Sequence, residues 1–202
     1  SQYIWHTFTN NNSSVWIAQR GGRAKDGDDR TNPSIIKMLY LSQRKHGMDF
    51  SSFINALNIV PVSISYEYDP CDVMKAKELY KVRTTGYYTK GNREDLISIL
   101  KGINEPKGRI HYSFCSPLQG DFETARDVAD VIDEKILTYY KLWPTNYIAY
   151  DTLFASDKYS NNYSQEQKQS FLGRYAETQE ELFRVVLEIY ARPVINYESY
   201  VD

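Results

Sequence analysis

The sequence contains few cysteines and few histidines, and it has no long apolar run. Its 202 residues include two cysteines, Cys71 and Cys115, and three histidines. Two cysteines cannot build the disulfide framework of a small secreted protein and give no paired metal-ligand spacing, so a reducing cytoplasm is expected. No stretch approaches the roughly 20 apolar residues that cross a bilayer, and no signal-peptide pattern opens the sequence. Any membrane contact of these residues is therefore expected to be peripheral, at the inner face of the cell membrane.

A strong excess of charge of either sign is also missing. Lys and Arg total 24 and Asp and Glu total 26, which gives a net charge of -2. General affinity for nucleic acid requires a strongly basic face, so we predict no nucleic-acid partner. Hydrophobic residues make up 42% of the chain, which is enough to bury a core. The composition therefore predicts a globular protein.

The acidic residues do not form a calcium loop. Asp26, Asp28 and Asp29 lie close together in the sequence, and clustered aspartates suggest calcium. The glycine and the terminal glutamate of an EF-hand loop are not in place around them. We therefore predict no metal site and no cofactor, and we expect these carboxylates to pair with neighbouring cations.

A short apolar run, Val15–Ala18, leads into the first functional signal. The run is rich in strand formers, and the two glycines that follow predict a sharp exit from a strand. Three cations surround this exit. Small backbone lets the main chain approach a ligand closely, and guanidinium groups bind oxyanions through paired hydrogen bonds. The alternative is a solvated, charged loop. The predicted anion site consists of Arg20, Gly21, Gly22, Arg23 and Lys25.

The second signal is the apolar run Ile59–Tyr66, which predicts a strand that contains a proline, Pro61. Proline cannot donate a hydrogen bond to a neighbouring strand, so it is confined to edges, strand starts and bulges. Without further information, Pro61 is equally well explained as a marker of the sheet edge.

The ordered pair of signals resembles the glycerolipid acyltransferases, the family of glycerol-3-phosphate and 1-acylglycerol-3-phosphate acyltransferases. A Gly-Gly-Arg-x-Lys loop follows one strand, and an Ile-Val-Pro-Val strand follows an intervening helix. Three sequence segments are similar to those of a bacterial branch of the family: Trp-Ile-Ala-Gln-Arg, Ala-Lys-Asp-Gly and Ser-Tyr-Glu-Tyr-Asp-Pro-Cys-Asp. The resemblance implies transfer of a fatty acyl group from acyl-CoA, acyl carrier protein or another donor. The acceptor would be a hydroxyl of glycerol 3-phosphate or of a lysophospholipid.

The resemblance also assigns roles to residues. It implies that Arg23, helped by Arg20 or Lys25, holds the acceptor phosphate beside Gly21 and Gly22. It implies that the wall of the acyl channel is formed by Val60, Pro61 and Val62.

Two departures from the family pattern concern catalysis. The family places a glutamate immediately before the motif glycine, where this chain has Arg20 or Gly21. The catalytic His-x-x-x-x-Asp motif is missing, since His6 is followed five positions later by Asn11. We expect that the chain begins after the catalytic pair, that it holds no catalytic residue, and that it is inactive alone.

His111, on a predicted strand, has no nearby acid implied by the sequence. The alternative function is a non-catalytic module that binds phosphate or anionic lipid.

The order of predicted elements favours an α/β fold. A helix from Pro33 to about Arg44, capped by Thr31 or Asn32, and a short helix over residues 50–57 separate the two predicted strands. Strand, helix, strand is a parallel crossover pattern, so the Val15 and Ile59 strands should be parallel neighbours. We predict a mostly parallel sheet flanked by helices in residues 1–118, the C-terminal part of an acyltransferase domain. Residues 119–202 are predicted to form a helical extension, ending with a helix from Leu182 to Tyr190.

Overall fold

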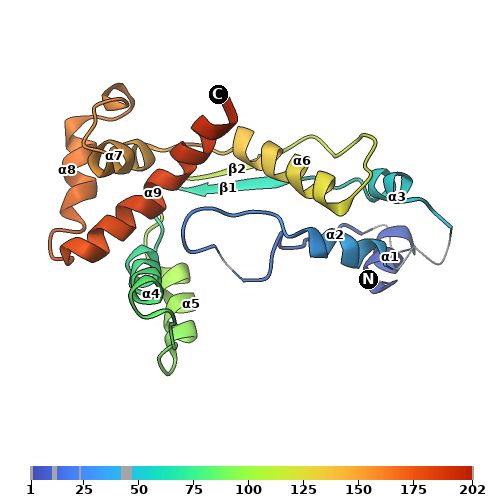
Figure 1. The fold of residues 1–202 in the computed structure, drawn as a ribbon, viewed down its shortest axis with the longest axis horizontal. Helices are drawn as coiled ribbons and strands as arrows, with labels where there is room; N and C mark the ends of the chain where they lie inside the picture. The colour runs from blue at the N-terminus through green and yellow to red at the C-terminus, as the bar shows by residue number, and fades with distance from the viewer. Residues whose placement is uncertain (1, 11–12, 23, 42–46, 202) are drawn as a thin grey trace. The chain divides into compact units, whose positions relative to one another are not determined.

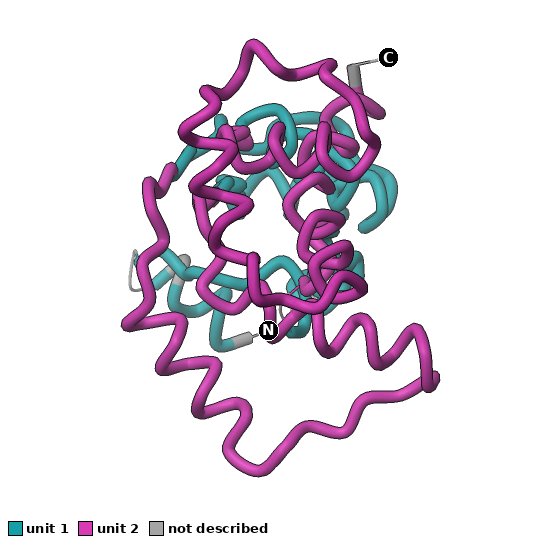
Figure 2. The backbone as a smooth tube through the Cα atoms, turned by 90° about the vertical axis from the view of Figure 1, so that its left-hand side faces the viewer, with its two compact units in different colours: residues 1–23, 29–63, 112–139 teal, residues 24–28, 64–111, 140–202 magenta. Residues whose placement is uncertain are grey.

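The fold of the protein is seen in a computed structural model that describes residues 2–10, 13–22, 24–41 and 47–201 (Figure 1). Contacts divide the chain into two compact units, which Figure 2 shows in different colours. Unit 1 comprises residues 1–23, 29–63 and 112–139. Unit 2 comprises residues 24–28, 64–111 and 140–202. We predicted a boundary between residues 118 and 119, at the end of the acyltransferase part. The division into contact units does not test that boundary, so it stays a prediction.

Unit 1 is built mainly from four helices: α1 (Gln2–Asn10), α2 (Pro33–Tyr40), α3 (Phe50–Leu57) and α6 (Ala125–Thr138). The predicted start of α2 is confirmed, because the Asn32 side chain accepts a hydrogen bond from the Ser34 amide and Pro33 occupies the first turn. The core of the unit gathers apolar side chains from these helices, among them Ile36, Phe53, Ile54 and Val128.

Unit 2 contains α4 (Asp72–Thr85), α5 (Glu94–Asn104), α7 (Pro144–Leu153), α8 (Gln165–Gly173) and α9 (Glu180–Val201). A short 3-10 helix, Ser160–Asn162, precedes α8. Helix α9 packs against both α7 and α4, and its buried side chains form one core with those of α7 and α8. Ile148, Phe171, Val186 and Ala191 are fully buried in this core.

Helix α9 continues past the proline at which we predicted its end. Pro193 lies inside the helix, which reaches Val201. A proline in a helix removes one hydrogen bond, but the turn can persist when packing continues beyond it. Val194 and Asn196 are both buried, at 1% and 6% exposure, so the face that packs on the unit extends past the proline. The prediction of a break at Pro193 was wrong because burial outweighed the local preference.

The described residues contain one sheet, which has two strands, β1 (Val62–Tyr66) and β2 (Ile110–Phe114). Within unit 1 the Cys115 amide donates to the Pro61 carbonyl (3.0 Å), and within unit 2 the Glu67 amide donates to the Arg109 carbonyl (2.9 Å). Residue numbers rise along one strand as they fall along the other, so the pairing is antiparallel. The predicted α/β fold with a mostly parallel sheet is therefore wrong.

The apolar run at Val15 explains part of this error. Residues 13–18 have no regular structure, and Val15, Trp16 and Ile17 are exposed at 40%, 69% and 39%. Four strand-forming residues are too few to establish a strand when no neighbouring strand and no core cover them. The predicted parallel pair with Ile59 consequently does not form.

A helix must be both long and apolar to cross a membrane. None of the helices that the structure describes is both long enough and apolar enough to span a bilayer.

Candidate anion-binding site

The predicted acceptor-phosphate residues are divided between the two units. Arg20, Gly21 and Gly22 belong to unit 1, Lys25 belongs to unit 2, and Arg23 lies outside the described residues. Lys25 forms an ion pair with Glu78 of α4, so a carboxylate already balances its charge. The structure thus does not gather the predicted cations within one unit.

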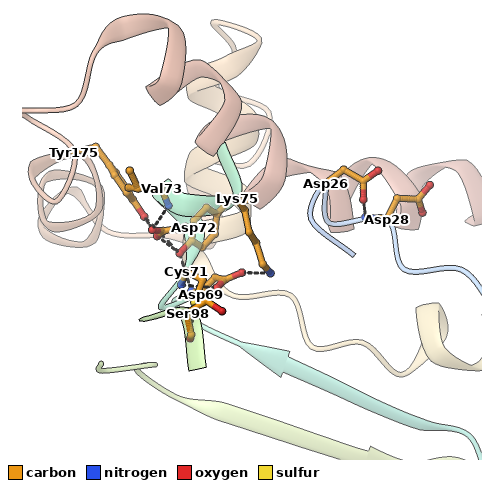
Figure 3. Close-up of polar contacts among 10 residues, drawn as sticks. Asp26, Asp28, Asp69, Cys71, Asp72, Val73, Lys75, Ser98 and Tyr175 are labelled. Atoms are coloured by element: carbon orange, nitrogen blue, oxygen red, sulfur yellow. Dashed lines mark hydrogen bonds and ion pairs between the residues drawn. The ribbon is translucent and has the colours of Figure 1, made fainter. Parts of the chain in front are cut away.

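The segment after Arg23 is held firmly by unit 2. Gly27 has a φ of +79°, and a Cβ atom at this position would lie 2.5 Å from the Ile189 carbonyl oxygen of α9. The Asn196 side chain of the same helix donates a hydrogen bond to Asp28 (2.9 Å). Asp26 accepts from the Asp28 amide, as Figure 3 shows. Among the described residues no group of His, Cys, Asp or Glu side chains is arranged to hold a metal ion.

The predicted acyl-channel residues lie in unit 1 at the start of β1. Val60 is 38% exposed, Pro61 is buried, and Val62 opens the strand. Pro61 precedes the strand, a position that needs no amide donor, and its carbonyl accepts from Cys115. None of the three lines the pocket described next.

A pocket of about 330 Å³ lies in unit 2. Its lining comes from the residue before β2, the start of α7, the 3-10 helix and the first turn of α8. We call it the Trp143 pocket, and its lining residues are Arg109, Lys141, Leu142, Trp143, Pro144, Tyr147, Asn162 and Gln167.

Local sequence fixes the inner wall of the Trp143 pocket. Trp143 is the N-cap residue of α7, and Pro144 occupies the first helical position. The Trp143 amide donates to the Asn146 side chain (2.8 Å), whose Nδ2 donates to the Tyr190 carbonyl (2.9 Å). The buried Asn146 side chain therefore connects the backbone of Trp143 to α9, which fixes the position of Trp143 in the protein without a ligand.

Two cations lie beside the Trp143 ring. The Arg109 guanidinium carbon is 4.8 Å from the ring centroid, and Lys141 Nζ is 5.9 Å from it. Arg109 also makes paired hydrogen bonds to Glu67, from Nε (3.0 Å) and Nη2 (2.8 Å). These bonds lower the pKa of Glu67 and raise the pKa of Arg109, so both groups stay charged near neutrality. No hydrogen bond or ion pair to Lys141 Nζ is found among the described residues.

The polar groups of the Trp143 pocket are mostly hydrogen-bond donors. Trp143 is 6% exposed, and its Nε1–H has no acceptor among the described residues. A buried donor without an acceptor is uncommon, because it costs about 1–3 kcal/mol of desolvation. No acidic residue lines the pocket. Two cations, an indole N–H and side-chain amides suit a ligand that brings negatively charged oxygens.

A second polar cluster of unit 2 surrounds the buried carboxylate of Asp72, the first residue of α4 (Figure 3). Asp72 Oδ2 accepts from the hydroxyls of Tyr175 (2.5 Å) and Tyr190 (2.9 Å), and Oδ1 accepts from the Val73 amide (2.6 Å). The Tyr190 hydroxyl in turn accepts from the Asp69 amide (2.8 Å). Three donors and the positive end of a helix compensate the charge, so we assign the cluster to stability.

The two tyrosines of this cluster predict sensitivity to alkali. Burial, followed by the charge of Asp72, raises the pKa of Tyr175 and of Tyr190 above the usual value of 10.0. A group whose pKa is higher in the folded state contributes stability that is complete below its unfolded pKa and is lost as the pH rises. We therefore expect unfolding to begin above about pH 10.

Parallel titrations of tyrosinate absorbance and far-ultraviolet circular dichroism measure this effect. Exposed tyrosines should ionise first, and the last part of the absorbance change should coincide with the loss of circular dichroism, because Tyr175 and Tyr190 ionise only when the fold opens. In the Tyr175→Phe variant one such group is absent, so the loss of stability with pH should be shallower. Full tyrosine ionisation with intact helicity would contradict the expectation.

Sequence reasoning missed the residues of the Trp143 pocket. No pattern in the sequence analysis pointed to Arg109, Trp143 or Pro144. The run Lys-Leu-Trp-Pro, which places a cation and an indole before a helix, was the available signal. Arg109 could not be added to it, because 32 positions separate it from Lys141 and only the fold brings the two together.

No protein-family model matches the chain, and comparisons with curated proteins and with solved structures likewise give no match. Any functional conclusion therefore depends on the residues and their geometry.

Proposed function

We propose that this chain binds a phosphate-bearing group and that the Trp143 pocket receives it. The observation that carries the proposal is a pocket lined by two cations and no acid, at a tryptophan whose buried Nε1–H has no acceptor among the described residues. The ligand class is a phosphate monoester, either a soluble one such as glycerol 3-phosphate or the headgroup of a lysophospholipid such as lysophosphatidate.

The chemistry of phosphate fits these donors. Its oxygens accept hydrogen bonds and carry the charge that Lys141 and Arg109 attract. The bonds between Arg109 and Glu67 offset part of that attraction, so Lys141 and Trp143 are expected to contribute most. A volume of about 330 Å³ accommodates a phosphate group with a short polyol.

The acyltransferase suggested by the sequence resemblance is a second candidate. In that case the chain supplies the acceptor site through Arg23, at the cytoplasmic face of the membrane, and the catalytic base lies outside it. The observation that favours it is the anchoring of residues on both sides of Arg23. The Gln19 carbonyl accepts from Asn32, and Gly27 packs on α9.

Calorimetric titration with glycerol 3-phosphate, and separately with dispersed lysophosphatidate, tests the two candidates. Trp143→Phe keeps an aromatic ring but removes the N–H and part of the indole surface, so we expect its affinity to fall about 10- to 100-fold, the value of a hydrogen bond to a charged group. Its stability should fall, because phenylalanine is smaller than the buried indole and leaves a cavity, so binding is compared at temperatures where both proteins are folded. Binding of both ligands identifies the phosphate as the recognised group, whereas binding of lysophosphatidate alone identifies the lipid.

Two further variants serve as controls. Lys168→Gln removes a cation of α8 that does not line the pocket, so its affinity should equal that of the unaltered protein. Arg23→Ala should also bind normally if the pocket is the site. A loss confined to Arg23→Ala would instead support the acceptor site of the acyltransferase candidate. Absence of binding to the unaltered chain would contradict both proposals.

A further inference from the structure

Helix α5 exposes nearly all of its apolar side chains. We call Leu96, Ile97, Ile99, Leu100 and Ile103 the α5 apolar face; their exposures are 53%, 47%, 53%, 48% and 69%. They recur at spacings of three and four residues, so they share one side of the helix. Figure 1 shows α5 at the end of unit 2 that lies away from α7 and α8. Contiguous exposed apolar patches of this kind mark interaction surfaces in soluble proteins.

The side by which α5 attaches to unit 2 is small and polar. Ser98 is the one α5 residue that is fully buried, at 8% exposure, and its carbonyl accepts from Cys71 Sγ (3.4 Å). An amphipathic helix of a globular protein normally turns its apolar side to the core. Here the orientation is reversed, so the α5 apolar face is not needed for the packing of the unit.

The surroundings of α5 are basic although the chain as a whole is acidic. Residues 81–109 contain seven Lys or Arg and three Asp or Glu, and Arg83 and Arg109 pair with Glu188 and Glu67 outside the segment, which leaves it net positive, whereas the whole chain carries -2. Lys101 lies within the helix, and Lys107 donates to the carbonyls of Ile103 (3.4 Å) and Glu105 (3.1 Å) at its end. Tyr87, 67% exposed, lies in the connection between α4 and α5. Tyrosine and lysine are the residues that anchor helices at a membrane surface.

We propose that α5 docks on an anionic lipid bilayer, with the α5 apolar face in the boundary between headgroups and acyl chains. An apolar helix face bordered by cations is the pattern of interfacial helices. A second copy of the chain is a poorer occupant, because two α5 helices would bring two regions of net positive charge together. The proposal stands on α5 alone and does not require ligand binding in the Trp143 pocket.

Flotation of the full chain with vesicles tests the docking. Vesicles of phosphatidylcholine with about 30 mol% phosphatidylglycerol should bind the protein, and vesicles of phosphatidylcholine alone should bind it much more weakly. The double variant Ile99→Ser/Ile103→Ser should bind about 100-fold more weakly, since the partition energy follows the number of buried carbon atoms. Lys101→Gln should reduce binding about fivefold, the effect of one cation near an anionic surface.

Matched controls distinguish binding through the α5 apolar face from non-specific adsorption of exposed apolar side chains to vesicles. Trp16→Ser removes an exposed apolar side chain of unit 1 with the same 69% exposure as Ile103, and vesicle binding should not change. Because Cys71 and Cys115 are buried, Ile103→Cys supplies a selectively reactive thiol. An environment-sensitive dye at that thiol should shift to the blue on anionic vesicles. Equal binding by the unaltered and double variants, or no binding by either, would overturn the proposal. A dimer that the double variant disrupts, without vesicle binding, would assign the face to a second copy.

Discussion

Replacing Asp72 with alanine should lower the free energy of unfolding by about 3–5 kcal/mol. The substitution leaves the hydroxyls of Tyr175 and Tyr190 without their acceptor in a buried site. It also removes the side-chain acceptor of the Val73 amide in the first turn of α4. Because Tyr175 follows α8 and Tyr190 belongs to α9, the loss should loosen the contact of α4 with the rest of unit 2. Urea denaturation followed by circular dichroism measures the change.

Two control substitutions show whether the loss of stability comes from the buried hydrogen bonds of Asp72. Asp72→Asn keeps one carbonyl oxygen, so its cost should be clearly smaller than that of alanine. Asp130→Ala removes a carboxylate from the surface of α6, where the side chain is 63% exposed, and should change stability by less than about 0.5 kcal/mol. An Asp72→Ala variant as stable as Asp130→Ala would show that the cluster contributes nothing to the fold.

Replacing Gly27 with alanine should cost about 2–4 kcal/mol, for two separate reasons. A φ of +79° is unfavourable for any residue with a Cβ atom, and this Cβ would lie 2.5 Å from the Ile189 carbonyl oxygen. The obstacle is helix backbone and cannot rotate away. The loop or α9 must therefore shift, which would also strain the hydrogen bond between Asn196 and Asp28. Thermal and urea unfolding of the variant measure the loss.

A glycine in open space provides the control. Gly102 lies inside α5 with no neighbouring atom within 4 Å of a built Cβ. Gly102→Ala should stabilise the protein by up to about 1 kcal/mol, because alanine favours the helix. Similar effects of the two substitutions would mean that Gly27 does not pack closely on α9.

Helix starts were the part of the fold that the sequence predicted best. Asn32 and Pro33 begin α2 as predicted, and the local pattern of Ser164 with Gln167 forms a capping box at the start of α8. These interactions join residues within one turn, so the sequence contains all their partners. The end of α9 could not be predicted in this way, because tertiary burial beyond Pro193 decides it.

The pairing of the sheet could not be predicted because its two strands are far apart in the sequence. A strand at Val15 requires a neighbour and a cover, and the structure provides neither. The partner of β1 is β2, 40 or more residues along the chain, and nothing local selects it over a parallel partner. Within β1 the buried positions are Ser63 and Ser65, a pattern that an apolar-inward interpretation of the strand does not anticipate. The Trp143 pocket was missed for the same reason of distance.

The anchoring of residues 24–28 on α9 sets an order of events during synthesis. Asp28 and Asn196 are 168 positions apart, so α9 completes a loop that is synthesised much earlier. A ribosome adds about 5–20 residues per second, so on the order of ten seconds pass between the synthesis of Gly27 and that of its partners. During that interval the surface that receives Gly27 does not exist. Residues 24–28 can therefore reach their final conformation only after α9 has been synthesised, and a chain released before α9 would carry this segment without its support.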